Sequence, residues 1–473
     1  MQNLDMKICS VSFQFGFERN EMTITRGSII GMLHEDSESG LFRVKRSAFI
    51  DEEIFDLEMK HIFEGNWIFL GHEAQIPKNH DFFTTYMGRQ PVIISRDGEG
   101  NLAGVLNSCS HRGAQLQVEK CGNARRMTCP FHSWTYNSSG KLLSFGNSPT
   151  AGYGPGFQKA ELDLVQLPHL ESYRGFIWGS LSSDVKSLSE FLGEAKKFID
   201  LIVNQDPNGE LEIVPGPQSY TFDGNWKLQT ENGVDGYHVN SIHGNYVATT
   251  KNRVSIDGAN ARVKPMDVEN FSKYPGGFYA FENGHVVLWN QSPNPEVRAT
   301  WLHQDELSEK YGEDTAWWMI NCWRNLCLYP NVFLMDQMSS QIRIVRPISV
   351  EKTEIRTMCF APKSDTPSER ANRIRQYEDF FNATGMATPD DVAAFNSSQR
   401  GFHATNMEWS DVSRGSLNIV DGGDERATKL GIAPKFTGTQ LQDEAIYLNQ
   451  HHYWQELLLA GMEENNKKET IID

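Results

Sequence analysis

Two short cysteine–histidine pairs constrain this chain more than any other feature of its sequence. Cys109 and His111 form a Cys-x-His pair, and Cys129 and His132 form a Cys-x-x-His pair 17 residues further on. Each pair lies at a turn between short runs of β-type alternation, so two hairpin tips can converge on one metal centre. Seven cysteines in 473 residues are few, and their odd number fits poorly with a disulfide framework. The four residues therefore indicate a metal site.

Chance clustering, a zinc site and an iron–sulfur cluster are the alternatives for these four residues. Zinc is held tetrahedrally by sets of two cysteines and two histidines. Zinc fingers, however, normally pair Cys with Cys and His with His along the chain. In this sequence each pair supplies one thiolate and one imidazole, which favours a cluster whose two irons take two Cys and two His respectively.

A second candidate site lies about a hundred residues downstream and contains Asp235, His238 and His243. Asp235 and His238 are three residues apart and share one face of a helix. His238 and His243 are five residues apart, which is about 140° around an ideal helix. Both can face one ion only at a helix end or a π-bulge. Two histidines and one carboxylate are the ligand set of non-haem Fe(II) oxygenases.

The charge balance excludes some classes of partner. The 61 acidic and 44 basic residues give a formal net charge of −17, which argues against binding to nucleic acid or to an anionic membrane. The sequence contains no apolar run of about 20 residues that predicts a membrane span. The first residues lack a signal-peptide pattern, and Met22 is a plausible alternative start that makes residues 1–21 an upstream extension. We expect a cytoplasmic protein.

The hydrophobic pattern divides the chain into regions of different character. Residues 27–65 look mainly helical, and residues 67–180 consist of short β-type runs, with hairpin signals at Asp97-Gly98 and Ser139-Gly140. Helical periodicity returns at 187–205, where Ser187 and Glu190 form a capping box. We expect two antiparallel strands within 340–363 and a helix over 368–385.

These regions predict an α+β fold in which a small all-β domain is inserted into a larger α+β domain. We divide the chain into an N-terminal helical segment that packs with the catalytic domain (1–66), the all-β domain (67–180) and the larger catalytic domain (181–473).

The segments NSCSHRGAQL and TCPFHSWTY resemble the Rieske signature, Cys-x-His-Arg-Gly followed by Cys-Pro-x-His-x-Trp. The resemblance implies a [2Fe–2S] cluster in which Cys109 and Cys129 bind one iron and His111 and His132 bind the other. Gly113 is expected to serve the turn beneath the cluster, in a conformation that a side chain disfavours.

The segment from Asn225 to His243 is similar to the mononuclear-iron motif of Rieske aromatic-ring-hydroxylating dioxygenase α subunits. The resemblance implies His238 and His243 as ligands of a non-haem Fe(II). It implies that the carboxylate of Asp235 links His238 to the Rieske ligand His132 of a neighbouring subunit, in a trimer of α subunits.

In the enzymes that this chain resembles, the third iron ligand comes from a downstream stretch of the form Gly-x₄-Asp-Asp. In this sequence the stretch begins at Gly385, and Asp391 matches the ligand, with Asp390 as the alternative. The resemblance extends from about residue 25 to the C-terminus. It implies an antiparallel sheet packed with helices, of the helix-grip type.

Motifs such as GGFYAFENGH and RNLCLYPN are closest to the benzoate and toluate 1,2-dioxygenases, with anthranilate 1,2-dioxygenase nearby. The resemblance implies addition of both atoms of O₂ to a benzoate ring, giving a cis-1,2-dihydrodiol carboxylate. It implies NADH and FAD acting through a separate flavin/iron–sulfur reductase, and a small β subunit in an α₃β₃ hexamer. The alternatives are an anthranilate dioxygenase, a salicylate-type Rieske monooxygenase, an electron carrier and a zinc scaffold.

Three residues bear on the choice of substrate. Benzoate-type enzymes carry a tryptophan after the second iron histidine, and this chain has Gly244 there, which predicts a larger pocket. A carboxylate substrate needs a cationic or strongly donating anchor. Arg343 and Arg324 are of a suitable type, but the sequence favours a surface or subunit-interface position for both.

Overall fold

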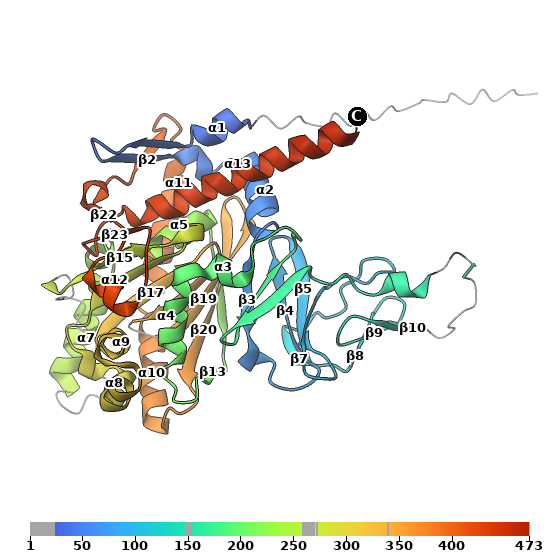
Figure 1. Ribbon diagram of the computed structural model, residues 1–473, viewed down its shortest axis with the longest axis horizontal. Helices are drawn as coiled ribbons and strands as arrows, with labels where there is room; N and C mark the ends of the chain where they lie inside the picture. The colour runs from blue at the N-terminus through green and yellow to red at the C-terminus, as the bar shows by residue number, and fades with distance from the viewer. Residues whose placement is uncertain are drawn as a thin grey trace, which may run out of the picture.

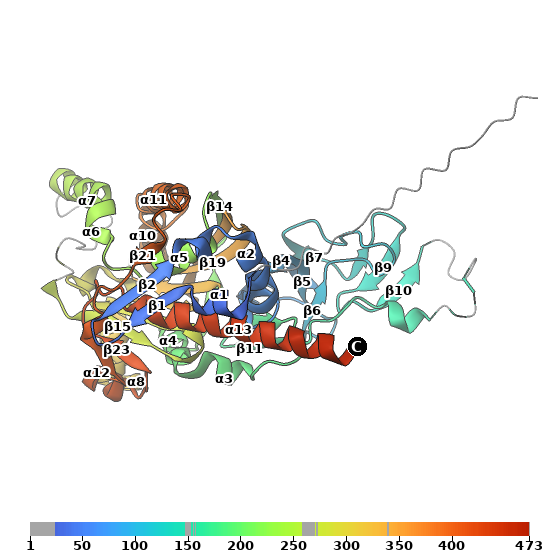
Figure 2. The ribbon, with the colours of Figure 1, turned by 90° about the horizontal axis from the view of Figure 1, so that it is seen from above.

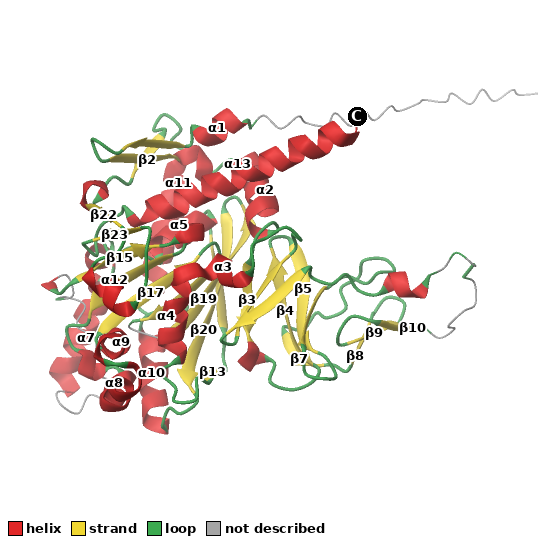
Figure 3. Ribbon diagram, viewed as in Figure 1, coloured by secondary structure: helices red, strands yellow, loops and turns green. Residues whose placement is uncertain are grey.

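The structure, a computed structural model, describes residues 24–146, 153–154, 156, 158–257, 270, 273–337 and 340–472. A large region of mixed helix and strand lies beside a smaller region of strands and loops (Figures 1 and 3). The predicted α+β fold with an inserted all-β unit is confirmed. The alternative start at Met22 falls outside the described residues. No helix in the described part of the chain is both long and apolar enough to cross a membrane.

The smaller region contains three antiparallel sheets. One has the order β6-β5-β4-β7, a second β10-β9-β8 and a third β11-β12-β3. The predicted hairpins at Asp97-Gly98 and Ser139-Gly140 are confirmed, because they join β5 to β6 and β9 to β10. The strands are β3 (Ile68–His72), β4 (Asp81–Met87), β5 (Gln90–Arg96), β6 (Leu102–Leu106), β7 (Cys121–Asn123), β8 (Arg126–Thr128), β9 (Trp134–Asn137), β10 (Leu142–Phe145), β11 (His169–Tyr173) and β12 (Phe176–Ser180).

The larger region is built on one antiparallel sheet of ten strands within the described residues. Its order is β13-β20-β19-β18-β17-β16-β15-β23-β22, with β14 also paired to β20. The predicted strand pair within 340–363 is confirmed as β19 and β20. The strands are β13 (Leu211–Ile213), β14 (Gln218–Phe222), β15 (Gly276–Ala280), β16 (Val286–Gln291), β17 (Cys322–Leu328), β18 (Val332–Asp336), β19 (Ser340–Ser349), β20 (Lys352–Pro362), β22 (Ile419–Asp421) and β23 (Phe436–Gly438).

The two faces of this sheet pack against different helices. Because successive strand residues point to opposite faces, Val286 and Leu288 enter one core while Val287 and Trp289 enter the other. The first core also holds side chains of α2 (Glu52–Glu58), α5 (Trp226–Asn232), α11 (Thr388–Phe402) and α13 (Ile446–Ile472). The second holds side chains of α3 (Leu188–Leu192), α4 (Lys196–Val203), α8 (Gln304–Tyr311), α9 (Glu313–Ile320) and α12 (Glu425–Leu430).

The N-terminal segment differs from the mainly helical structure expected over 27–65. Residues 33–45 form a hairpin, β1 (Leu33–Asp36) and β2 (Leu41–Lys45), to which β21 (Trp409–Asp411) adds a third strand. The Asp36 carboxylate accepts hydrogen bonds from the amides of Glu38 and Ser39 and closes the turn. The helical prediction is therefore wrong for 33–45. Helix α1 (Arg26–Ile30) and α2 lie against α13 (Figure 2).

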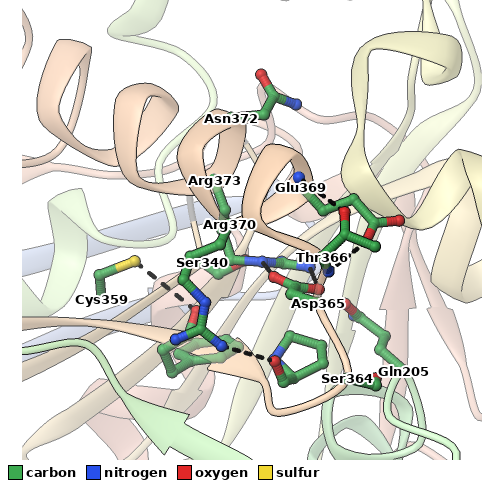
Figure 4. Close-up of polar contacts among 12 residues, drawn as sticks. Gln205, Ser340, Cys359, Ser364, Asp365, Thr366, Glu369, Arg370, Asn372 and Arg373 are labelled. Atoms are coloured by element: carbon green, nitrogen blue, oxygen red, sulfur yellow. Dashed lines mark hydrogen bonds and ion pairs between the residues drawn. The ribbon is translucent and has the colours of Figure 1, made fainter.

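Two predicted helices are shorter than expected. The helix predicted over 187–205 starts at the confirmed capping box but is interrupted between α3 and α4. The helix predicted over 368–385 is α10 (Pro367–Asp379), which ends six residues before Gly385. The Arg373 side chain of α10 pairs with Asp365 at 2.9 Å and also contacts Ser340 of β19 (Figure 4). These contacts fix α10 on the sheet and position the segment that leads into α11.

Candidate active site and electron-transfer centre

The two Cys–His loops have the same backbone design. Cys109 and His111 follow β6, and Cys129 and His132 lie between β8 and β9. In each loop the cysteine N–H donates to the carbonyl five residues on, at 2.9 Å for Cys109 and 2.7 Å for Cys129. Each cysteine carbonyl accepts from the N–H four residues on, which belongs to a residue of positive φ. The loops are therefore tight turns that present two pairs of side chains in equivalent ways.

The four side chains of these loops offer two thiols and two imidazoles. Cys109 and Cys129 are buried in the core of the β region and are not joined in a disulfide. The rings of His111 and His132 meet edge to face, with centroids 4.5 Å apart, and Trp134 stacks on His111 at 4.8 Å. The Nδ1 atom of each imidazole is buried and has no hydrogen-bond partner among the described residues. This donor set fits a cluster that takes two thiolates and two neutral imidazoles.

Electrostatics favour the neutral form of His132. Desolvation, with the nearby His111 and the Arg112 guanidinium, lowers the pKa of His132. Sequence reasoning missed Tyr136, whose hydroxyl lies 3.4 Å from Cys109 Sγ and accepts from the Ser110 amide at 3.3 Å. Hydrogen bonds to cluster sulfurs are one of the factors that set a cluster's potential. The sequence offers one signal for this role of Tyr136: it lies two residues after Trp134 on strand β9, so both side chains point to the same face.

His238, His243 and Asp391 converge on one point in the larger region. His238 and His243 flank the one-turn helix α6 (Val239–Ile242), and α7 (Gly244–Asp257) follows. The break at His243 (φ −90°, ψ 23°) is a helix end of the kind that the spacing required. The two Nε2 atoms are 3.2 Å apart, and Asp391 Oδ1 lies 3.5 Å from the first and 3.4 Å from the second. Three ligand-type atoms thus surround a position suited to one cation.

The neighbouring side chains orient this group. Asp235 Oδ2 lies 2.9 Å from His238 Nδ1, which leaves the Nε2 atom of His238 to face His243 and Asp391. Asp391 is in the first turn of α11, where a carboxylate is favoured by the helix dipole. Asp390, the alternative, is not among the convergent groups. The Asn232 amide, absent from the sequence prediction, lies 3.4 Å from both His238 Nε2 and Asp391 Oδ1.

Burial perturbs the pKa of all three convergent groups. Desolvation raises the pKa of Asp391 to about 6, although His238 and Arg343 act in the opposite direction. Desolvation, the His238 ring and Arg343 lower the pKa of His243 to about 3. Burial alone lowers the pKa of His238, but its hydrogen bond to Asp235 and the nearby carboxylates outweigh this and raise it. A divalent cation relieves the cost of holding Asp391 ionised in this position, so the donor set fits a metal.

A pocket that is open to the surface adjoins the convergent group. Its walls are largely apolar and aromatic, and Arg343, Asn325 and Gln337 add polar groups. Arg343 is 1% exposed and Arg324 is 2% exposed. The predicted surface position is therefore wrong for both arginines. They lie on paired strands in the interior of the sheet region. Apolar walls with a few placed polar groups are typical of a small-molecule site.

Gly244 does not line this cavity. It is exposed, and a Cβ atom at this position meets nothing within 4 Å. The prediction that the missing tryptophan enlarges the pocket is therefore wrong, because this position faces outward at the start of α7.

The two candidate centres lie at opposite ends of the molecule. The loops of the Cys–His pairs adjoin β8 and β9, whereas α6 is at the far side of the larger region (Figure 2). Within one chain the two centres are therefore well separated.

Comparisons with known proteins follow this division. A family model described as the ring hydroxylating alpha subunit (catalytic domain) matches residues 214–464, and a Rieske [2Fe-2S] domain model matches residues 66–158. The alpha subunit of toluate 1,2-dioxygenase from Pseudomonas putida is 48% identical over 92% of this chain and 95% of that protein. The large subunit of 2-halobenzoate 1,2-dioxygenase from Burkholderia cepacia is 46% identical over 93% of this chain and 95% of its own length.

Among solved structures, naphthalene 1,2-dioxygenase from Rhodococcus sp. bound to indole is similar, with a TM-score of 0.76 and 25% identity. The match covers 92% of this chain and 98% of that one. The catalytic-domain model covers more than half of the chain, and the curated relatives match along nearly all of it. The chain therefore belongs to the family of ring-hydroxylating dioxygenase α subunits, which combine a Rieske [2Fe–2S] domain with a catalytic non-haem iron domain.

Proposed function

We propose that this chain is the α subunit of an oxygenase that adds both atoms of O₂ to benzoate or a substituted benzoate, giving a cis-1,2-dihydrodiol carboxylate. The observation that carries the proposal is the convergence of His238, His243 and Asp391 at the wall of an aromatic-lined cavity. The names of the relatives, toluate and 2-halobenzoate dioxygenases, support an aromatic carboxylate. We also propose three parts of the chain: an N-terminal segment that packs with the catalytic domain (1–66), the Rieske domain (67–180) and the catalytic domain (181–473).

Cys109, Cys129, His111 and His132 would hold the [2Fe–2S] cluster, and their loops fit it as described above. His238, His243 and Asp391 would hold the mononuclear iron. When bound, the cluster supplies single electrons and the iron supplies open positions for O₂.

The protein's own contribution is to bind the ring, orient it and exclude water. The apolar walls of the cavity, including Phe380 and Leu288, take the ring out of water. Asp235 Oδ2 lies 2.9 Å from His238 Nδ1 and so favours the tautomer that carries its proton on Nδ1 and leaves Nε2 free to bind a metal.

The electron supply requires partners. We propose an NADH-dependent flavin/iron–sulfur reductase, which places the enzyme in the cytoplasm, and a small β subunit in an α₃β₃ hexamer. The separation of the two centres within one chain supports transfer between neighbouring α subunits, from the Rieske ligand His132 of one to the Asp235–His238 pair of the next.

A panel of benzoate, toluates, 2-halobenzoates and anthranilate with ¹⁸O₂ and reductase tests the reaction. We expect two labelled oxygen atoms in the product of at least one benzoate. A single labelled atom indicates a salicylate-type monooxygenase instead, and product from anthranilate alone indicates the anthranilate alternative.

The His243→Ala variant tests the iron site. We expect it to keep the Rieske absorption spectrum but to lose product formation and the second iron, as measured by metal analysis. Product formed at the wild-type rate with the cluster intact contradicts the assignment and leaves the electron-carrier alternative.

A further inference from the structure

The side chain of Arg343 differs from every other buried cation in the described part of the chain. Lys227, Arg298, Arg324 and Arg373 each pair with a carboxylate. Figure 4 shows one of these pairs, between Arg373 and Asp365. Arg343 is 1% exposed and has no carboxylate partner within ion-pair distance among the described residues. A buried, unpaired charge is unfavourable, so this position calls for an anion.

The donors that remain free on Arg343 lie on one edge of the guanidinium. Nη1 has a long contact of 3.4 Å with Gln229 Oε1, and the guanidinium lies over the Phe381 ring with 4.9 Å to its centroid. The Nε and Nη2 atoms are buried and have no hydrogen-bond partner among the residues that the structure describes. These two N–H groups are parallel, and arginine uses them to donate two hydrogen bonds to one carboxylate.

Strand alternation places the Arg343 side chain on the active-site face of the sheet. On β19, Ile342 and Ile344 enter the core with α3 and α4, so Arg343 points to the opposite face, which carries the convergent group. Arg343 lines the same cavity as His243 and Asp391, and its charge acts on both groups: it adds to the lowering of the His243 pKa and partly offsets the rise of the Asp391 pKa that burial causes.

Arg324 lines that cavity too but is not equivalent. Its side chain pairs with Asp336 and with the Trp318 carbonyl, so its donors are used within the protein.

We propose that Arg343 anchors the carboxylate of the substrate through its Nε and Nη2 atoms. The proposal rests on the proposed function, because it takes the substrate to be an aromatic carboxylate. A carboxylate held on this edge leaves its ring among the aromatic walls at Phe380 and Phe381. Arg343 is thus a specificity-determining residue that selects benzoates over neutral rings.

Binding to the purified holoenzyme, without reductase and without oxygen, tests the anchor independently of turnover. Titration calorimetry with benzoate and with the neutral analogue benzamide compares the wild type with Arg343→Gln and Arg343→Lys. We expect the Gln variant to lose about 10- to 100-fold in benzoate affinity, because charge-assisted hydrogen bonds are lost. Its benzamide affinity should change less than about threefold. The Lys variant keeps the positive charge but cannot donate two parallel hydrogen bonds, so its benzoate affinity should lie between those of the wild type and the Gln variant.

Arg346→Gln is the matched control. Arg346 is on the same strand, three residues on, but its side chain pairs with Glu354 at 2.8 Å and does not line the cavity. We expect wild-type affinity for both ligands, and the Rieske absorption spectrum reports that each variant is folded. If Arg343→Gln does not fold, the Lys variant decides, since an unchanged benzoate affinity in it contradicts bidentate anchoring.

The outcomes separate the anchor from the proposed function. If the wild type binds benzoate and Arg343→Gln binds it equally well, Arg343 is not the anchor and the proposed function stands. If the wild type binds or converts no aromatic carboxylate, both proposals are wrong. If Arg343→Gln loses affinity for benzoate but not for benzamide, the result supports both the anchor and the proposed function.

Discussion

Asp235 and Asp391 are both carboxylates beside His238, yet their surroundings give them different roles. Asp391 is 4% exposed and faces both imidazole Nε2 atoms. Asp235 faces the opposite nitrogen of His238. Asp391 is therefore placed where it could bind a metal together with both histidines, and Asp235 is placed where it could orient His238.

Asp235→Asn should keep both the cluster and the mononuclear iron but lower product formation by about 10- to 100-fold, because an amide no longer holds the His238 proton with a charge. Metal analysis and single-turnover product yield measure the two effects. Asp421→Asn, at an exposed position of β22, is the control. A proportional loss of iron and activity in Asp235→Asn points instead to a ligand role.

Metal binding should weaken as the pH falls through about 6. The pKa of Asp391 is raised from 3.8 to about 6 in the metal-free protein. The metal-free fold therefore loses stability as the pH rises from about 4 to about 6, because this carboxyl ionises more readily in the unfolded chain. A cation must displace its proton below that pH. The Tm increase on adding Fe(II) or Co(II) anaerobically should therefore be larger at pH 7.5 than at pH 5. An equal increase at both pH values contradicts the assignment, and Asp391→Asn should show little increase at either.

At the scale of the element, the ligand loops depend on backbone conformation. Gly113 has φ +75°, and a Cβ there meets only Ser108 Oγ, at 3.8 Å. The cost of a side chain is therefore conformational and not steric. In the second loop the equivalent position is Ser133, with φ +57°. The role of Gly113 was predictable because glycine marks such turns, whereas Ser133 carries no such signal.

Gly113→Ala should destabilise the Rieske loop by about 1–2 kcal/mol, the cost of a left-handed conformation for an L-residue. We expect a lower [2Fe–2S] content after purification and a faster loss of the visible absorbance of the cluster on heating. Ser133→Gly removes the same strain and should keep or increase cluster stability. Equal cluster stability in Gly113→Ala and the wild type contradicts this account.

The sequence predicts local features of the fold better than long-range ones. Ser187 and Glu190 define a helix start, and Asp97-Gly98 defines a hairpin, because each signal depends on neighbours in the chain. The hairpin over 33–45 was missed because its third strand, β21, is some 360 residues away in the sequence and contributes no local signal.

The same distinction applies to the candidate sites. The Cys–His pairs and the histidines at 238 and 243 are visible as spaced motifs. Tyr136, Asn232 and Arg343 are single residues that reach their sites through sheet register and helix packing. Their roles follow only from the three-dimensional structure, as the mistaken surface position for Arg343 illustrates.

At the scale of the whole molecule, one buried cluster joins three distant segments. The Glu58 carboxylate, on α2, is fully buried and pairs with Lys227 of α5. It also accepts hydrogen bonds from Trp226 Nε1 at 2.7 Å and from Trp454 Nε1, on α13, at 2.8 Å. Helix α5 leads directly to Asn232 and the iron-site histidines, so this cluster ties the N-terminal segment and the last helix to the catalytic centre.

Glu58→Gln should destabilise the protein by about 3–5 kcal/mol, because it leaves the Lys227 ammonium buried without a counter-charge. Burial already lowers the pKa of Lys227, and the Glu58 carboxylate opposes that effect. The variant should therefore show a Tm several degrees below the wild type. Glu58→Gln combined with Lys227→Met removes both charges and should recover much of the loss. If the double variant is no more stable than Glu58→Gln, hydrogen bonds to the two indoles, and not the ion pair, account for the stability of this junction.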